Sequence, residues 1–214
     1  MRTALAVSVP AVSDPVTVAQ VKQHSRIDHD GDDELLATYL SAATAMAEGY
    51  LSQALLTQTL VWTLTPGAVR WNGRTWLDRR IELPRAPVQS IVSVVMLDIR
   101  GNATAIVAAA LPASRTTPLI GWIADLSAEP LTLRIGRKTV LSGGQPLCAT
   151  PLESLTVTFV AGYDQPNDVP PEIRTALMMV TTHLYEHRGD DSGGGMPMAA
   201  QWLLERRRLQ FMGA

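Results

Sequence analysis

Residues 32–64 read DDELLATYLSAATAMAEGYLSQALLTQTLVWTL, and the spacing of their apolar side chains changes within this stretch. The first part gives a helical wheel with one apolar face, made by Leu36, Leu40, Ala43, Ala47, Tyr50 and Leu51. From Leu56 onward, large apolar residues alternate with threonines at the period of two that is expected of a half-buried strand. A long helix followed directly by a strand predicts an α+β fold.

The residues before this stretch predict a shorter helix and an acidic turn. Thr17 and Gln20 have the spacing of a capping box, which predicts a helix that ends near Ser25. We interpret the acidic run Asp28–Glu34 as N-capping and favourable charge in the first turn of the long helix. The alternative is an electrostatic docking surface for an arginine-bearing neighbour. The first residues, up to 14, are expected to form an extended arm.

The middle of the chain is predicted to be rich in strands. The alternation of apolar and polar residues occurs at Leu56–Leu64, Leu131–Ile135 and Leu155–Phe159. A continuous apolar run, Ile91–Leu97, precedes a turn signal at Arg100–Asn102. Frequent prolines in this part favour short antiparallel strands joined by irregular loops.

Helical periodicity returns after residue 165. Asp168–Glu172 is a strong helix start, because proline is tolerated in the first turn. An apolar stripe follows, made by Ile173, Ala176, Leu177, Val180 and Leu184. The glycine-rich residues Gly189–Gly195 predict a flexible tether, and a final helix is expected from about Ala199 to Phe211.

These signals predict a helical unit built from both chain ends, with a β-rich insertion between them. The expected segments are an extended N-terminal arm (1–14), the first part of the helical core (15–54), the β-rich insertion (55–165), the second part of the helical core (166–188), a flexible linker (189–198) and a C-terminal helix (199–214).

Composition narrows the function classes. The 214 residues are 46% hydrophobic and 18% charged, with a formal net charge of −2, which does not favour general binding to nucleic acid or to an anionic membrane. Cys148 is the single cysteine, so neither an internal disulfide nor a cysteine-based zinc cluster can form within the chain. No apolar run approaches the ~20 residues of a membrane span. We therefore expect a soluble protein that carries no cofactor.

One motif suggests metal chemistry. His183-Leu184-Tyr185-Glu186-His187 matches the H-x-x-E-H pattern of inverted zinc proteases, in which two histidines share a metal and the glutamate activates water. We favour a second interpretation, that these are partly buried histidines at a helix C-terminus, with His187 close to the core stripe and His183 at its edge. A zinc-dependent hydrolase remains the alternative.

The C-terminal helix is the candidate partner-binding segment. Its wheel has two apolar faces, one with Trp202 and Leu209 beside Arg206, the other with Leu204 and Phe211 flanked by Arg207 and Arg208. A tethered helix of this kind cannot bury both faces by packing once on its own domain, and tryptophan, phenylalanine and arginine are enriched at interfaces. The alternative is a terminal helix that folds back on the core by one face.

Three ordered sets of residues resemble the head–tail connector (adaptor) proteins of long-tailed bacteriophages and gene-transfer particles. The first set is Pro15–Asp28, Asp32–Leu36 and Ala47–Tyr50; the second is Leu83–Ile91; the third is Val157–Tyr163, Val169–Arg174 and His183–Arg188. Two positions depart from the family pattern, Ser25 in place of leucine and His187 where asparagine is common, and residues 108–151 match no pattern of the family.

The resemblance implies a structural subunit in the neck of the virion and no enzyme. It implies a ring, a dodecamer in the particle, that docks beneath the portal protein and extends the DNA channel. It also implies a contact with the next neck or stopper protein, and DNA only as the content of the channel. In this family a C-terminal helix commonly engages the portal, which assigns that role to Trp202, Leu204, Arg206, Arg207, Arg208, Leu209 and Phe211. A different neck protein, a stopper or tail-completion factor, is the nearest alternative.

Overall fold

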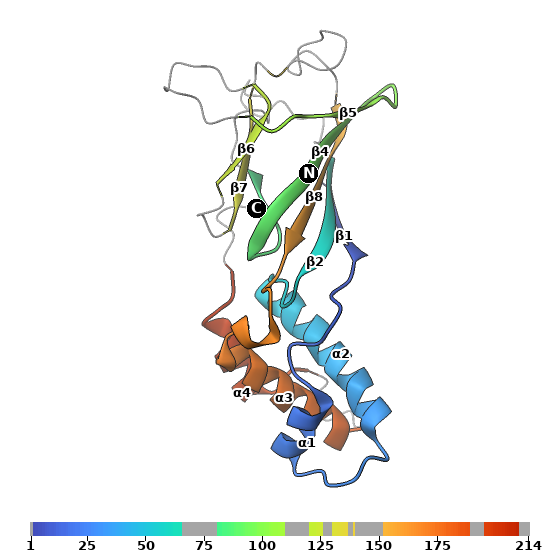
Figure 1. Ribbon diagram of the computed structural model, residues 1–214, viewed down its shortest axis with the longest axis vertical. Coiled ribbons are helices and arrows are strands. Elements are labelled where there is room, and N and C mark those ends of the chain that lie inside the picture. The colour runs from blue at the N-terminus through green and yellow to red at the C-terminus, as the bar shows by residue number, and fades with distance from the viewer. Residues whose placement is uncertain are drawn as a thin grey trace. The chain divides into compact units, whose positions relative to one another are not determined.

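A computed structural model describes residues 2–65, 81–109, 120–125, 130–136, 139, 152–188 and 195–209 (Figure 1). Three features singled out above lie outside these residues: Cys148, most of the glycine-rich tether and Phe211. None of the helices in the described ranges is both long enough and apolar enough to span a membrane.

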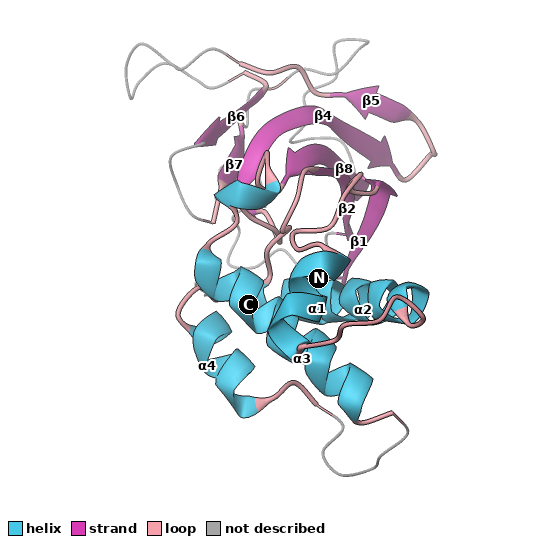
Figure 2. Cartoon of the chain, turned by 60° about the horizontal axis from the view of Figure 1, so that its bottom comes forward, coloured by secondary structure: helices cyan, strands magenta, loops and turns pink. Residues whose placement is uncertain are grey.

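The described residues contain both helices and antiparallel strands, so the prediction of an α+β fold is confirmed (Figure 2). The helices are α1 (Val18–Ser25), α2 (Asp33–Leu51), α3 (Pro171–Glu186) and α4 (Met198–Glu205), with a short 3-10 helix at Pro166–Asp168. The strands are β1 (Arg2–Val9), β2 (Gln58–Thr65), β3 (Ile81–Glu82), β4 (Val88–Asp98), β5 (Ala103–Ala105), β6 (Trp122–Asp125), β7 (Thr132–Ile135) and β8 (Leu152–Ala161).

The chain divides into two compact units. A helical unit comprises Ala11–Thr57 and Gly162–Met212, and a sheet unit comprises Met1–Pro10 and Gln58–Ala161. The helical unit therefore takes its helices from two distant parts of the sequence.

Local sequence signals account for the helices. The Thr17 side chain accepts a hydrogen bond from the backbone N–H of Gln20 at 3.2 Å, and the Gln20 side chain accepts one from the Thr17 N–H at 3.0 Å, which confirms the capping box. The predicted stripes of the long helices α2 and α3 form the core of the helical unit. Its fully or nearly fully buried members include Val21, Leu36, Leu40, Ala43, Ala47, Leu51, Ile173, Ala176, Leu177 and Val180.

Two antiparallel sheets make up the sheet unit. One has five strands in the order β1-β2-β8-β4-β5, and the other has three in the order β3-β7-β6. The alternation predicted for β2 is confirmed, because Leu60, Trp62 and Leu64 are buried while the intervening residues are half-buried. The predicted turn after Ile91–Leu97 is also present, where the Asp98 carboxylate accepts hydrogen bonds from backbone N–H groups in the turn.

The N-terminal residues form a strand of the five-stranded sheet. The sequence predicted an arm over residues 1–14, whereas Arg2–Val9 forms the edge strand β1, which pairs antiparallel with β2 (Figure 1). Pairing satisfies backbone groups that an isolated arm would leave to water. A periodicity argument cannot identify the strand that supplies these partners, because that strand lies about fifty residues away in the sequence.

A close backbone contact requires glycine at residue 162. Gly162 follows β8 with φ of 118°, and a Cβ atom at this position would lie 2.1 Å from the carbonyl oxygen of Leu56. The neighbouring Thr57 N–H donates to the Tyr163 carbonyl at 3.0 Å. A side chain at residue 162 would therefore displace the backbone that leads into and out of the helical unit.

Candidate partner-binding surface on the C-terminal helix

The helix that the sequence assigned to a partner is shorter than expected and is followed by a turn. α4 ends at Glu205, and the Arg207 N–H donates to the Leu204 carbonyl at 2.8 Å. At its start, the Gln201 side chain donates to the Met196 carbonyl at 2.8 Å. The chain then runs back along the end of α2, where the Leu209 N–H donates to the Leu51 carbonyl at 3.1 Å.

One face of α4 is buried in the core of its own unit. Ala200 and Leu204 have no exposed surface, and α4 packs against α3 and, less extensively, α2. The tethered helix therefore folds back on the core by one face, which is the alternative interpretation given above. The physical reason is that burying an apolar face on a preformed helix pair stabilises the fold without requiring a partner.

Polar contacts hold the segment that follows α4. The Gln53 side chain donates to the Arg207 carbonyl at 2.7 Å, and the Arg207 guanidinium lies 3.2 Å from the Glu172 carboxylate. The Tyr50 hydroxyl donates to the Glu205 carboxylate, which raises the pKa of Tyr50 because ionisation would remove the donor. The pKa of Glu172 is lowered, mainly by a hydrogen bond that its carboxylate accepts from its own backbone N–H and secondly by the hydrogen bond from Arg207.

The opposite face of α4 carries a large exposed apolar side chain. Trp202 is 69% exposed, and Met198, one turn earlier, is 67% exposed. Arg206 and Arg208 are also exposed, and the Arg208 guanidinium lies 5.1 Å from the centre of the Tyr50 ring. We call Trp202, Arg206 and Arg208 the C-terminal surface. An exposed tryptophan and two exposed arginines within seven consecutive residues have the composition of an interface anchor.

The seven residues predicted to bind a partner thus occupy different environments. Leu204 has no exposed surface, Leu209 is half-buried, Arg207 pairs with Glu172, and Phe211 lies outside the described residues. Partner binding by the three residues of the C-terminal surface stays a prediction.

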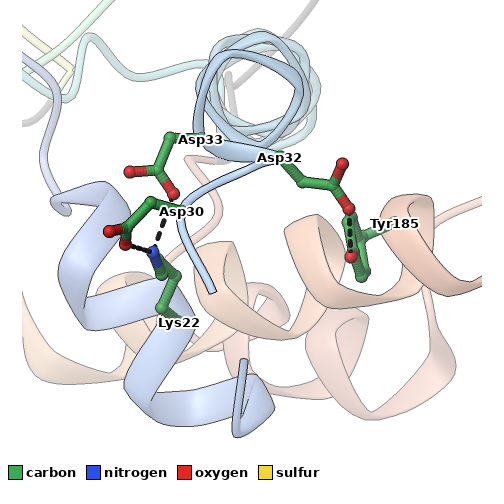
Figure 3. A network of polar contacts seen from close by, with 5 residues as sticks. All are labelled: Lys22, Asp30, Asp32, Asp33 and Tyr185. Carbon is green, nitrogen blue, oxygen red and sulfur yellow. Dashed lines mark hydrogen bonds and ion pairs between the residues drawn. The ribbon is translucent and has the colours of Figure 1, made fainter. Parts of the chain in front are cut away.

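The acidic turn holds the helices of this unit together (Figure 3). Lys22 of α1 donates to Asp30 at 2.5 Å and to Asp33 at 2.8 Å, while the Tyr185 hydroxyl of α3 donates to Asp32 at 2.6 Å. As predicted, Asp32 occupies the N-cap position of α2 and Asp33 and Glu34 lie in its first turn, but the Asp32 side chain makes no capping hydrogen bond. The hydrogen bond from Tyr185 lowers the pKa of Asp32, and the one from Lys22 lowers that of Asp30.

The histidine pair lies at the end of α3. The His183 and His187 rings have centroids 4.3 Å apart. His183 is half-buried, but His187 is exposed at the C-cap and not close to the core stripe as predicted. The helix has already ended at residue 186, so the wheel no longer gives the direction of the next side chain. Within the described residues no group of three or more histidine, cysteine, aspartate or glutamate side chains could hold a metal ion.

Sequence reasoning missed the residues that hold the acidic turn and the C-terminal segment. Tyr50, in the last turn of α2, and Gln53, just after this helix, contact residues about 150 positions later. Tyr185 contacts Asp32 across a similar separation in the sequence. A polar residue at a helix edge carries no sign of its distant partner. One available signal was Tyr50 itself, whose ring was assigned to the apolar face while its hydroxyl required a hydrogen-bond partner.

Comparisons with known proteins give a shared fold and a family match over part of the chain. Residues 15–98 match the family described as phage gp6-like head-tail connector protein. No curated protein matches the chain. A chain in the virion of a native gene transfer agent particle is similar with a TM-score of 0.68 and 22% identity, covering 98% of each chain.

Two chains from necks of such particles have the same fold. One, from an empty particle computed with C6 symmetry, has a TM-score of 0.64 and 24% identity over 100% of this chain and 99% of that one. The other, from a native particle computed with C12 symmetry, has a TM-score of 0.64 and 23% identity over the same shares. The fold is thus shared along the whole length, and residues 15–98, which run from the segment before α1 to the end of β4, match the model of the phage gp6-like head-tail connector family.

Proposed function

We propose that this chain is a structural connector subunit in the neck of a phage-like particle, where it joins the head to the tail. The observation that supports this best is the family match over residues 15–98, together with a fold shared over nearly the full length of chains from gene transfer agent virions and necks. In family terms, the helical unit is the connector core and the sheet unit is the insertion.

We further propose that identical subunits form a ring of twelve beneath the portal protein. The similar neck structures were computed with C6 and C12 symmetry, which supports a cyclic arrangement of this chain. DNA would pass through the ring as channel content, and the next neck protein would bind on the side away from the portal. The net charge of −2 agrees with a subunit that does not hold DNA tightly.

A structural role is also favoured over catalysis. The histidine pair has no third ligand among the described residues, and His187 is exposed at a helix end. Stoichiometric zinc in purified protein, lost in a His183→Ala variant, would favour the hydrolase alternative.

The C-terminal surface is our candidate for the portal contact. Leu204 fixes α4 to the core, so Trp202, Arg206 and Arg208 are presented on a rigid support and not on a free tether. A rigid anchor loses less conformational entropy on binding than a mobile one. Trp202 is the largest exposed apolar side chain of this surface.

The test is portal binding by a Trp202→Ala variant, measured by biolayer interferometry against the portal protein of the same particle. Truncation of a buried aromatic anchor costs about 2 kcal/mol or more, which corresponds to a roughly 30-fold weaker Kd. Val12→Ala is the control, because Val12 is fully exposed and lies outside the helices and strands.

The outcomes separate the alternatives. Weaker binding by Trp202→Ala alone supports the C-terminal surface as the portal contact. Equal binding by both variants and the wild type places the portal contact elsewhere. Absence of any portal binding by the wild-type chain favours a stopper or tail-completion protein over an adaptor.

A further inference from the structure

The five-stranded sheet has an edge that the described residues do not cover. β1 pairs with β2 and with no other described strand, so the backbone groups on its outer side have no strand partner in this part of the chain. All of its described side chains from Thr3 to Val9 are exposed. An edge of this kind is a template for pairing with another strand.

The buried face of the sheet continues onto this strand. Leu5 lies opposite Trp62 and Val7 lies opposite Leu60, and residues that are directly opposite in an antiparallel pair point to the same face. Trp62 and Leu60 are 6% and 2% exposed, whereas Leu5 and Val7 are 37% and 54% exposed. Among the described residues, the apolar face therefore extends one strand beyond its buried part, onto β1.

The strand also lacks the usual protection of a free edge. Soluble proteins commonly place lysine, proline or an inward-pointing charge on edge strands to prevent association. Residues 3–9 contain no ionisable side chain and no proline. The protective features are Arg2, at the first position of β1, and the register shift between Val7 and Val9, and both leave Leu5 within regular pairing.

The opposite edge of the same sheet has a matching character. It is formed by β5, and Ile99 before this strand is 63% exposed. The Val107 side chain after it is 77% exposed, although its carbonyl accepts a hydrogen bond from the Trp122 N–H at 3.0 Å. Residues 102–109 contain no ionisable side chain, so neither edge would repel the other electrostatically. A cyclic ring requires two different surfaces of one chain that fit each other. The two edges of this sheet meet that requirement.

We propose that β1 of one subunit adds to the β5 edge of the neighbouring subunit, so that the occupant of the uncovered edge is a second copy of this chain. This inference rests on the ring proposed above. All neighbouring strands in the five-stranded sheet are antiparallel, so β1 and β5 run in the same direction. Rotation about a ring axis that lies nearly along the strands preserves this direction, and the added strand is parallel to β5.

The first experiment compares Val7→Lys with Val12→Lys in complexes with the portal protein of the same particle, analysed by native mass spectrometry. A lysine at residue 7 would have to be buried at the junction, whereas Val12 is fully exposed and lies outside the sheet. We expect Val7→Lys to keep the wild-type melting temperature and portal binding as single subunits but to lose the closed ring. Val12→Lys should form the ring as the wild type does.

The second experiment identifies the occupant by cross-linking. In a Cys148→Ser background, Val7→Cys and Thr104→Cys are combined and treated with a short bis-maleimide on portal-bound complexes. We expect a ladder of covalent oligomers from the double variant, and no covalent oligomers from either single variant. The residue 7 thiol should react with maleimide in the monomer and be protected in the ring.

Several results would overturn the proposal. A Val7→Lys variant that closes the ring normally shows that β1 is not at the subunit contact, while the connector function stands. Protection of the residue 7 thiol in the monomer shows that a segment of the same chain covers the edge. Dimers from Val7→Cys alone show β1 pairing with itself. If the wild-type chain forms no ring with portal, this inference and the proposed ring both fail.

Discussion

A Leu204→Ala substitution tests whether α4 belongs to the core of the helical unit. Leu204 has no exposed surface and packs in the same cluster as Leu51, Leu177 and Val180. Replacing a buried leucine with alanine costs 2–5 kcal/mol, depending on how far the site collapses. Because α4 has eight residues and can shift toward the space that is left, we expect about 2–3 kcal/mol.

The corresponding fall in melting temperature is about 4–12 °C, since 1 kcal/mol shifts the Tm of a chain of this size by roughly 2–4 °C. Circular dichroism at 222 nm or scanning calorimetry measures this shift. Trp202→Ala is the control on the same helix, and with Trp202 69% exposed it should change stability by no more than about 0.5 kcal/mol. A Leu204→Ala variant that melts with the wild type but no longer binds portal would refute the reasoning and restore the tethered helix.

Two further predictions concern the helical unit. Tyr185→Phe removes the hydroxyl that donates to Asp32 and lowers its pKa. A lowered folded-state pKa stabilises the fold above the ordinary carboxyl pKa of about 4, and this stability is lost as the pH falls through the folded-state pKa. The variant should therefore have a lower Tm than the wild type at pH 7, and its Tm should fall less between pH 7 and pH 3. Equal slopes for both proteins in this range would contradict it. Gly162→Ala should lower the free energy of unfolding, measured in urea, by more than about 1 kcal/mol, because the new Cβ would collide with the Leu56 carbonyl at a residue with positive φ. An unchanged urea midpoint would show that the backbone can shift to accommodate the Cβ at little cost in stability.

Local signals predicted the elements of this protein well. The Thr17–Gln20 capping box, the stripe that contains Leu36 and Leu40, and the alternation through Trp62 each depend on residues a few positions apart. Such patterns determine whether a segment can present one apolar face, and that property survives in the folded chain.

Sequence reasoning failed where the partner lies far away. The aspartates before α2 carry the composition of a helix cap, yet Lys22 and Tyr185 offered stronger partners once α1 and α3 packed beside the turn. The wheel of the C-terminal helix has two apolar faces, and only the surface provided by α2 and α3 decides that the face of Leu204 is buried and that of Trp202 exposed. These choices depend on tertiary contacts that no local pattern contains.

A cryo-electron microscopy reconstruction of the chain coexpressed with the portal protein of the same particle would show whether the chain forms a connector ring. We expect a ring of copies of this chain on the tail-facing end of the portal, with twelvefold density into which the helical unit fits and an open central channel. A portal that carries no added ring, or copies of this chain bound elsewhere on the particle, would contradict it.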